Sequence, residues 1–239
     1  MLKISVCVAT YNGATYIAAQ LRSILPQLGI NDEIIISDDG SSDDTLSIIN
    51  AFNDPRIIIF NNHELRSPSF NFENALKHCS GDLIFLSDQD DVWAAGKVDI
   101  LRHLLARFDI IVSDCYVVDT HLKILHNSFF KINKSKKGLL NNIIKNSYLG
   151  CCLAFKKDVL KIALPFPKNI PMHDWWIGVV GEVFFKTCFV PYQLVYYRRH
   201  GANASIAGSK SDFSIVQKIR WRFHLIVSLC VRCIKKALL

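Results

Sequence analysis

Three carboxylates within four positions are the residues best suited to chemistry in this chain. Asp88, Asp90 and Asp91 follow directly after the apolar run 83–86. Carboxylates at contact distance repel one another, so a stable chain normally keeps them apart. A divalent cation would offset the repulsion, and Mg²⁺ in particular binds through one or two carboxylates together with substrate phosphates. The pair Asp88 and Asp90 therefore favours a metal site with open positions directed outward.

Two more polar clusters follow apolar runs nearer the N-terminus. TYNG occupies 10–13 and DDGS occupies 38–41. Either sequence alone is typical of an ordinary turn. However, ligands of an open parallel sheet bind beyond the carboxyl ends of its strands. Three such clusters on the same edge of one predicted sheet therefore indicate a shared ligand site.

The elements that must position these clusters are repeated units of a strand followed by a helix. The apolar runs predict strands at 3–10, 32–41, 56–60 and 82–88. Amphipathic patterns predict helices at 15–25, from Asp43 or Asp44 to Phe52, at 70–79 and at 97–108. Strands that are apolar on nearly every residue, separated by amphipathic helices, are typical of a parallel sheet covered on both faces.

The second half of the chain has a less regular pattern. We expect a strand at 109–119, a strand running into a helix at 150–160, a helix at 173–185, and a strand at 188–199 that Pro191 interrupts or moves to a sheet edge. One α/β domain with a C-terminal appendage is the simplest organisation for 239 residues. No apolar run approaches the roughly 20 residues that a membrane-spanning helix needs.

Several common binding motifs are missing from the sequence. It has no phosphate-binding loop of the G-x-x-x-x-G-K-[ST] type, no EF-hand calcium loop and no G-x-G-x-x-G fingerprint after the first strand. The only C-x-x-C pair, Cys230 and Cys233, lacks the second pair or histidine of a zinc site. The N-terminus does not read as an export signal, so we expect reduced thiols in a cytosolic protein.

The motifs, in their order and spacing, resemble a known family. VCVATYNG, IIISDDGSSDDT and GDLIFLSDQDDVW, followed by MHDWW (172–176) and YYRRHGANAS (196–205), are similar to the family-2 inverting glycosyltransferases with the GT-A fold. The SDQDDVW and HDWW pair is most similar to bacterial enzymes of O-antigen and capsule synthesis, including glucosyl- and rhamnosyltransferases. The resemblance implies an α/β, Rossmann-like GT-A fold, with a mostly parallel sheet and helices on both faces.

The resemblance assigns five residues to the nucleotide-sugar donor. Thr10, Tyr11 and Asn12 would lie against the nucleoside. Asp39 would accept a hydrogen bond from the N3–H of the base, and Asp38 would support the loop that carries Asp39.

The resemblance also assigns residues that would contact the metal and the diphosphate. Asp88 would approach the ribose and the metal, and Asp90 would ligate Mg²⁺ or Mn²⁺ on the diphosphate. Arg199 and His200 would contact the diphosphate or the metal. The cation would neutralise charge that develops on the departing nucleoside diphosphate. Asp91 either supports these ligands or caps the next helix, and the sequence leaves both roles open.

An inverting transferase also needs a base that takes a proton from the acceptor hydroxyl. The resemblance points to Asp174 for this role. His173 stands where many relatives carry Glu, so its own role is open. Trp175 and Trp176 either stack on a sugar ring or belong to the core, and the core is expected for at least one of them.

These assignments combine into one expected function with two alternatives. The chain would transfer a hexose from a UDP-sugar such as UDP-glucose or UDP-galactose, or rhamnose from dTDP-rhamnose, to a polyprenyl-diphosphate-linked sugar of a surface polysaccharide. One alternative is an inactive sugar-nucleotide-binding or assembly protein, although every candidate catalytic position holds a competent residue. The other is a nucleotidyltransferase that makes a sugar nucleotide, although the typical G-G-x-G-[ST]-R loop is missing.

Positive charge is concentrated in two segments of the chain. Residues 131–145 hold five lysines and no acid, and residues 209–239 hold seven Lys and Arg against one Asp. Neither segment has the interleaved aromatic platforms expected for nucleic-acid binding, so we expect no nucleic-acid partner.

The C-terminal segment predicts a basic amphipathic helix. Its apolar stripe would comprise Ile215, Val216, Ile219, Phe223, Ile226, Val227, Cys230, Ile234 and Ala237. Lys218, Arg232, Lys235 and Lys236 point the other way, on a side that Trp221, Leu225 and Leu229 interrupt. The helix either packs its stripe on the domain or lies on an anionic membrane, and a lipid-linked acceptor favours the membrane.

The expected organisation follows from these assignments. A GT-A domain would occupy 1–208, with a nucleotide-sugar-binding half at 1–108 and an acceptor-binding half at 109–208. The basic helix at 209–239 would attach the protein peripherally to the cytoplasmic face of the inner membrane.

Overall fold

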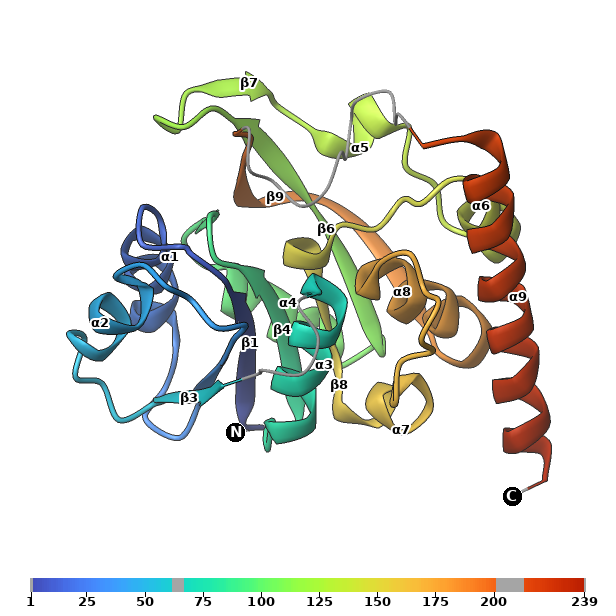
Figure 1. Ribbon diagram of the computed structural model, residues 1–239, viewed down its shortest axis with the longest axis horizontal. Coiled ribbons are helices and arrows are strands. Elements are labelled where there is room, and N and C mark those ends of the chain that lie inside the picture. Colours follow the sequence, from blue (N-terminus) through green and yellow to red (C-terminus); the bar gives the residue numbers. More distant parts are fainter. Residues whose placement is uncertain (1, 62–66, 201–212, 239) are drawn as a thin grey trace.

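The computed structural model describes residues 2–61, 67–200 and 213–238 (Figure 1). Its strands are β1 (Ile4–Thr10), β2 (Glu33–Asp38), β3 (Ile57–Asn61), β4 (Leu83–Asp88), β5 (Val92–Trp93), β6 (Ile110–Val118), β7 (Ile124–His126), β8 (Leu153–Lys156) and β9 (Thr187–Arg198). Within the described residues they form one sheet in the order β3-β2-β1-β4-β8-β6-β9-β5, with β7 paired to β6.

The strands β3, β2, β1 and β4 run parallel, as predicted. Thr10 of β1 pairs with Asp38 of β2, and Ala9 of β1 pairs with Asp88 of β4. The three polar clusters found in the sequence therefore begin at the same edge of the sheet. β1, β2 and β4 are buried over nearly their whole length, which is why their sequences are almost continuously apolar.

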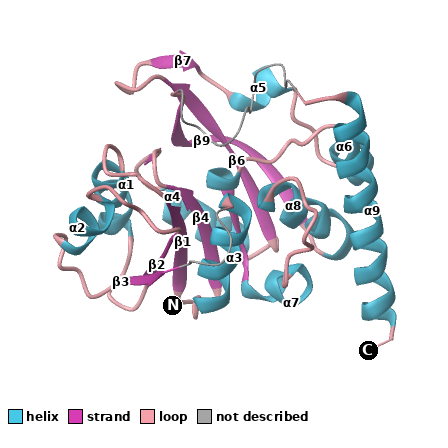
Figure 2. Ribbon diagram, viewed as in Figure 1, coloured by secondary structure: helices cyan, strands magenta, loops and turns pink. Residues whose placement is uncertain are grey.

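Helices cover both faces of this sheet (Figure 2). α1 (Ile17–Ile24), α2 (Thr45–Asn50) and α4 (Lys97–Leu105) contribute to the apolar core of one face. α3 (Pro68–His78), α7 (Leu160–Ala163) and α8 (His173–Phe184) contribute to the core of the other face. The predicted α/β fold with helices on both faces is confirmed.

The second half of the sheet is more mixed than predicted. β8 runs antiparallel to both β4 and β6, whereas β9 runs parallel to β6 and antiparallel to β5. Parallel pairing is therefore continuous from β3 to β4 and recurs between β6 and β9, and antiparallel pairs join the rest of the sheet. The strands β5 and β7 span two and three residues, too few for an alternating pattern to be visible in the sequence.

Strand β9 runs through Pro191 with a change of register. Ser113 of β6 lies opposite Val190, but the next residue, Asp114, lies opposite Gln193. Pro191 and Tyr192 are therefore extra residues at an irregularity, where a residue without an N–H is tolerated. The predicted interruption is confirmed. β9 lies between β6 and β5, but β5 pairs only with Val195 and Tyr196, so among the described residues no strand pairs with the outer side of β9 at Pro191.

The region between β6 and α8 contains short elements that the sequence did not predict. They are α5 (Phe129–Asn133), α6 (Leu139–Ile144) and the 3₁₀ turn η2 (Gly150–Cys152) that precedes β8. The strand running into a helix that was predicted at 150–160 is present as the four residues of β8, followed by a 3₁₀ turn and α7. Elements of one or two turns are too short to establish a helical period.

The C-terminal helix α9 (Ile215–Ala237) packs beside α6 and α8 on one side of the molecule (Figure 1). Leu225 and Leu229 are buried, whereas Ile215, Ile219 and Phe223 of the predicted stripe are each more than half exposed. The side that was expected to be basic is therefore the packing side, and the apolar stripe faces outward. No helix among the described residues is both long and apolar enough to cross a membrane.

Candidate active site

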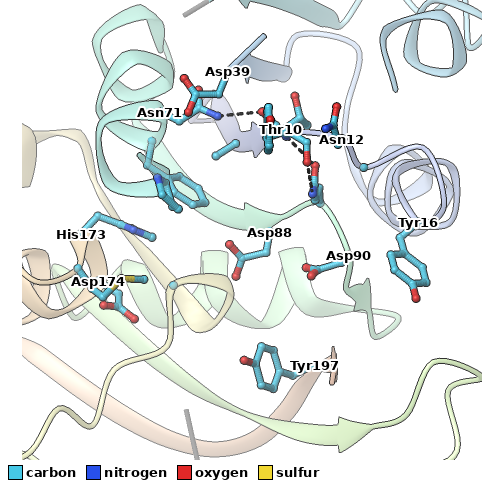
Figure 3. Close-up of a pocket in the computed structure, with 18 of the residues that line it drawn as sticks. Thr10, Asn12, Tyr16, Asp39, Asn71, Asp88, Asp90, His173, Asp174 and Tyr197 are labelled. Atoms are coloured by element: carbon cyan, nitrogen blue, oxygen red, sulfur yellow. Dashed lines mark hydrogen bonds between the residues drawn. The ribbon is translucent and has the colours of Figure 1, made fainter. Parts of the chain in front are cut away.

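A cavity of about 700 Å³ opens at the carboxyl edge of β1, β2 and β4 (Figure 3). It brings together residues from these strand ends, from α3, from η2, from the start of α8 and from the end of β9. The predicted residues that line it are Thr10, Tyr11, Asn12, Asp39, Asp88, Asp90, Asp174 and His200. Asp38 and Arg199 are not among the described lining residues.

The loop after β1 is held by the side chain of Gln89. The Tyr11 N–H donates to Gln89 Oε1 at 2.9 Å, and Gln89 Nε2 donates to the Tyr11 carbonyl at 3.0 Å. Gly13 leaves room for this side chain, since a Cβ at Gly13 would lie 2.6 Å from Gln89 Cδ. The amide of Gln89 thus fixes the β1 loop against the β4 loop.

The loop after β2 is built around the buried carboxylate of Asp38. Asp38 accepts hydrogen bonds from the Thr10 hydroxyl at 2.8 Å, from the Ser41 N–H at 2.7 Å and from the Ser41 hydroxyl at 2.6 Å. Asn12 adds a second link, because its Oδ1 accepts from the Ser42 N–H at 2.8 Å. Asp38 is thereby engaged inside the loop, while the neighbouring Asp39 lines the cavity.

The three carboxylates after β4 have different surroundings. Asp88 and Asp90 line the cavity. Asp91 is fully buried and accepts the Arg198 N–H of β9 at 2.9 Å. It does not cap the next helix, because α4 begins at Lys97 after Gly96. Of the two roles left open by the sequence, support of the neighbouring ligand residues is the one that this geometry favours.

The end of β9 closes the cavity beside these acids. His200 Nε2 lies 2.8 Å from Asp90 Oδ2, and its ring stacks on Tyr16 with the ring centroids 5.0 Å apart. Arg198 donates from Nε to the Asp90 carbonyl at 2.7 Å. Arg199 pairs through its N–H with the Val118 carbonyl at 2.8 Å, as part of the β6–β9 ladder.

The acids on this edge fit a divalent cation. Burial raises the pKa of Asp88 to about 8, and the negative charges of Asp90 and Asp174 add to this effect. Ligand atoms of Asp88, Asp91 and Cys151 lie within 4.8 Å of one another. However, Asp91 and Cys151 do not line the cavity, and Mg²⁺ and Mn²⁺ prefer oxygen ligands over a thiol. Asp88 and Asp90 are therefore the better-placed ligands, with His200 beside them.

Asp174 and His173 enter the cavity from the first turn of α8. Burial raises the pKa of the Asp174 carboxyl to about 7, although it accepts the Trp175 N–H at 2.5 Å. Burial also lowers the pKa of His173 to about 3, so its ring is neutral. Figure 3 shows Asp174 on one side of the pocket, facing the side from which Asp88 and Asp90 extend.

The two tryptophans that follow Asp174 belong to the core. The Trp175 indole N–H donates to the Asn142 carbonyl at 2.6 Å, and that of Trp176 donates to the Ala163 carbonyl at 2.9 Å. Both side chains are buried, and neither lines the cavity. Stacking of either ring on a sugar, one of the two predicted alternatives, does not fit this geometry.

Several lining residues had no recognisable signal in the sequence. Asn71 of α3 donates from Nδ2 to the Thr10 carbonyl at 3.0 Å. Tyr16, Phe72, Gly150 and Tyr197 also line the cavity. They come from separate elements and share no local motif, so only the fold brings them to the site.

Comparisons with known proteins place this fold and site in context. Residues 5–162 match the family model described as Glycosyl transferase family 2. The chain is 28% identical over 182 residues to the UDP-Glc:alpha-D-GlcNAc-diphosphoundecaprenol beta-1,3-glucosyltransferase WfgD of Escherichia coli, covering 75% of this chain and 70% of that relative. It is 26% identical over 242 residues to the dTDP-rhamnosyl transferase RfbG of Shigella flexneri, covering 89% of this chain and 80% of that relative.

Solved structures show the same fold. The structure of S. aureus TarS 1–349 in complex with UDP-GlcNAc is similar with a TM-score of 0.74 and 20% sequence identity. The match covers 95% of this chain and 66% of that one. At this level of identity the likeness speaks for the fold alone, and it confirms the predicted GT-A architecture.

Proposed function

Because the chain belongs to glycosyl transferase family 2 and is a glycosyltransferase, we propose that it moves a sugar from a nucleoside diphosphate sugar to a lipid-linked bacterial polysaccharide precursor. One observation carries the proposal. The cavity presents acids for a diphosphate-bound metal on one side and a buried carboxylate with a pKa of about 7 on the other. An assembly protein without catalysis has no need of the second group.

The donor side of the cavity fits a nucleotide. Asp39 is proposed to accept the N3–H of a uracil or thymine base, and Thr10, Tyr11 and Asn12 to lie against the nucleoside. The rigid loops described above support this role, because both are fixed by side-chain hydrogen bonds before any ligand binds. The printed names of the relatives, which include a UDP-Glc and a dTDP-rhamnosyl enzyme, favour UDP-hexose or dTDP-rhamnose as the donor.

Asp88 and Asp90 would hold Mg²⁺ or Mn²⁺, with His200 as a further contact. When bound, the cation would supply positive charge to the diphosphate that leaves the sugar. Arg199 is proposed to reach the diphosphate from the end of β9. Asp91 and Arg198 would keep this edge in place through their buried hydrogen bond.

Asp174 is proposed to act as the general base. The acceptor hydroxyl would attack the anomeric carbon as its proton passes to the Asp174 carboxylate, and the bond from that carbon to the diphosphate oxygen would break on the opposite face. This direct displacement inverts the anomeric centre. A base works best when its pKa lies near the working pH, and burial brings Asp174 to that range.

Turnover of labelled donors tests the proposal. Purified protein would be mixed with radiolabelled UDP-glucose, UDP-galactose or dTDP-rhamnose and a synthetic sugar-diphospholipid acceptor, with and without EDTA. We expect transfer of at least one sugar, abolished by EDTA and restored by Mg²⁺ or Mn²⁺. Donor binding without any transfer across acceptors would favour the sugar-nucleotide-binding alternative. Release of diphosphate from a nucleoside triphosphate and a sugar phosphate would favour a nucleotidyltransferase.

The outward stripe of α9 supports attachment to a membrane surface. Leu225 and Leu229 already pack the helix against the domain. Arg222 and Arg232 lie over the rings of Trp175 and Trp176, at 5.9 and 6.0 Å from the ring centroids. The stripe is therefore not needed for packing, and an apolar face left in water is costly.

We place this stripe on the cytoplasmic face of the inner membrane, in contact with anionic lipid. The described part of α9 and its flanks contains basic residues and no acid, and Arg220 and Lys235 are exposed. Each Lys or Arg near an anionic surface adds about 1 kcal/mol of attraction. A polyprenyl-diphosphate acceptor would be held at that same surface.

Flotation with liposomes tests the attachment. A double variant, Ile219→Asp with Phe223→Asp, changes two residues that are each 62% exposed, so the fold should persist. We expect wild-type protein to float with liposomes that contain phosphatidylglycerol and the double variant to remain in the lower fractions. Ile30→Asp, which charges an apolar residue 90% exposed elsewhere, is the matched control and should float. Equal flotation of the double variant would exclude the stripe as the anchor.

A further inference from the structure

His173 has a polar ring without a polar partner. It is only 3% exposed, and neither ring nitrogen has a hydrogen-bond partner among the described residues. The ring stacks on Phe72 with the centroids 4.0 Å apart. A phenylalanine would fill the same space without leaving a donor and an acceptor unsatisfied, which is unfavourable in a buried position.

The ring lies at the wall of the cavity, next to the proposed base. His173 lines the cavity together with Asp174, and Figure 3 shows both side chains extending from the start of α8 toward it. Gly150 of η2 leaves the space that the ring occupies, since a Cβ at Gly150 would lie 2.7 Å from His173 Nε2. η2 is itself fixed, because the buried Lys97 ammonium donates to the Cys151 carbonyl at 2.7 Å. The ring is therefore held at the cavity wall with both nitrogens covered, and a hydroxyl in the cavity reaches a nitrogen only when the ring turns toward it.

The chemistry of the ring indicates what it would bind. Burial lowers the pKa of His173 to about 3, so the imidazole carries one N–H donor and one acceptor nitrogen. A phosphate group offers acceptors and negative charge, and it is best bound by a cation. A sugar hydroxyl both donates and accepts, and it matches a neutral imidazole.

We propose that His173 is a specificity-determining residue that hydrogen-bonds a sugar hydroxyl in the cavity. This inference rests on the proposed sugar transfer and deepens it. The hydroxyl belongs either to the transferred sugar or to the acceptor sugar, since both would meet next to Asp174. A site built to bind a hydroxyl rejects an analogue that lacks it, because its own polar atoms are then left unpaired.

The test replaces His173 by Phe, which keeps an aromatic ring on Phe72 and removes both nitrogens. We expect the free variant to melt at the same temperature as wild type or higher, because the unpaired nitrogens are gone. His173→Gln, which restores a donor and an acceptor, should recover part of any lost binding. His78→Phe is the matched control, because His78 also stacks on a phenylalanine, Phe60, at 3.8 Å, but lies exposed outside the cavity.

Two measurements separate the two sources of the hydroxyl. Calorimetry compares UDP with UDP-glucose, or dTDP with dTDP-rhamnose, for whichever sugar the wild type transfers. If His173→Phe binds the sugar nucleotide with a tenfold or greater loss of affinity, while its affinity for the plain nucleotide is unchanged, the hydroxyl belongs to the donor. Unchanged donor binding with a tenfold or greater rise in KM for a GlcNAc-diphospholipid or other working acceptor assigns it to the acceptor.

The outcomes that overturn the inference are distinct from those that overturn the function. If wild type transfers sugar and His173→Phe matches it in both measurements, His173 is not a sugar contact. The inference also fails if both His173 variants lose several degrees of melting temperature while their donor and acceptor constants stay at wild-type values, because the ring is then purely structural. If wild-type protein neither binds nor transfers any sugar nucleotide, the proposed function itself is wrong, and this inference falls with it.

Discussion

Acids stand at both ends of the parallel strands β2 and β4, and the buried Glu33 at the amino ends has very different surroundings from Asp88 at the carboxyl ends. At the amino ends, the buried Glu33 accepts the Lys3 ammonium at 2.6 Å, the Ser5 hydroxyl at 2.5 Å and the Ser80 N–H at 2.6 Å. Burial by itself raises the pKa of Glu33, but these hydrogen bonds outweigh it and lower the pKa to about 2. At this end, therefore, the protein itself supplies the hydrogen-bond donors that the buried carboxylate needs, without a ligand.

Beyond the carboxyl ends, burial outweighs the hydrogen bonds in its effect on the pKa of the acids that line the cavity. Burial raises the pKa of Asp88 to about 8 and that of Asp174 to about 7, and for Asp88 the neighbouring charges of Asp90 and Asp174 increase the effect. An acid that serves only stability is surrounded by donors, whereas an acid that serves a ligand keeps an unfavourable environment until the ligand arrives. Asp38 follows the first pattern although it lies at the carboxyl end, because it is bonded within its own loop, whereas Asp88 and Asp174 line the cavity.

Removing an acid from the ligand end should have the largest effect on transfer. Asp90→Ala should lower the rate about a thousandfold or more, because charge on the leaving diphosphate is no longer neutralised. Initial rates at saturating Mg²⁺ or Mn²⁺ measure this, with circular dichroism to verify the fold. Asp82→Ala, just before the amino end of β4, removes a carboxylate that accepts the Lys3 N–H at 2.9 Å, and it should keep the wild-type rate. Equal transfer rates for Asp90→Ala and wild type would contradict the proposal that the acids at the carboxyl ends serve catalysis.

Neutralising the proposed base should have the next largest effect. Asp174→Asn keeps the size and shape of the side chain but cannot take a proton. We expect kcat to fall about a hundredfold or more while donor affinity stays within a few-fold of wild type. Single-turnover rates together with donor titration measure both quantities. Weakened donor binding at an unchanged kcat would instead make Asp174 a donor ligand.

The wild-type pH profile should show the raised pKa of Asp174 directly. The carboxylate is the active form, so kcat/KM should rise about tenfold per pH unit below the folded pKa of about 7 and level off above it. Rates between pH 5 and 9 at saturating metal give this profile. Constant kcat/KM down to pH 5 would show that no group with a pKa near 7 has to be ionised.

Changing an acid at the amino ends of the strands should leave the transfer activity almost unchanged. Glu33→Gln should stay within about twofold of wild type in kcat/KM but lose about 2 kcal/mol of unfolding free energy, since charged hydrogen bonds are lost. The folded pKa of Glu33 is lowered from 4.5 to about 2, so its contribution is present above pH 4.5 and is lost as pH falls toward 2. Urea denaturation at pH 7 and pH 3 measures the lost unfolding free energy and its pH dependence, and initial rates measure kcat/KM. Lost activity with intact stability would mean that the two ends are coupled.

The sequence was most informative where a strand ended. Because parallel strands share an edge, the positions of Asp39 and Asp88 could be predicted from local pattern alone. The clamp by Gln89 could not, because it joins loops separated by 78 residues and leaves no local trace. Asp91 was ambiguous for a similar reason, since its partner Arg198 is 107 residues away.

The tail shows a different limit of sequence patterns. The periodicity of α9 identified an apolar stripe and a mixed side, but it could not say which side the domain would take. In the sequence Leu225 and Leu229 interrupt a basic side, yet they are the buried residues of α9. Two buried leucines, with arginines over aromatic rings beside them, form the contacts of this side of the helix with the domain.

The pairing of Asp90 and Asp91 with the end of β9 has a consequence for biosynthesis. His200 and Arg198 meet these acids across 110 and 107 residues of chain, so the pairing must wait until β9 has left the ribosome. Until then a nascent chain can form the parallel block from β3 to β4, with its strand-end carboxylates still in water. The wall of the cavity that Tyr197 and His200 form is therefore added to the parallel block about a hundred residues after the acids that it covers.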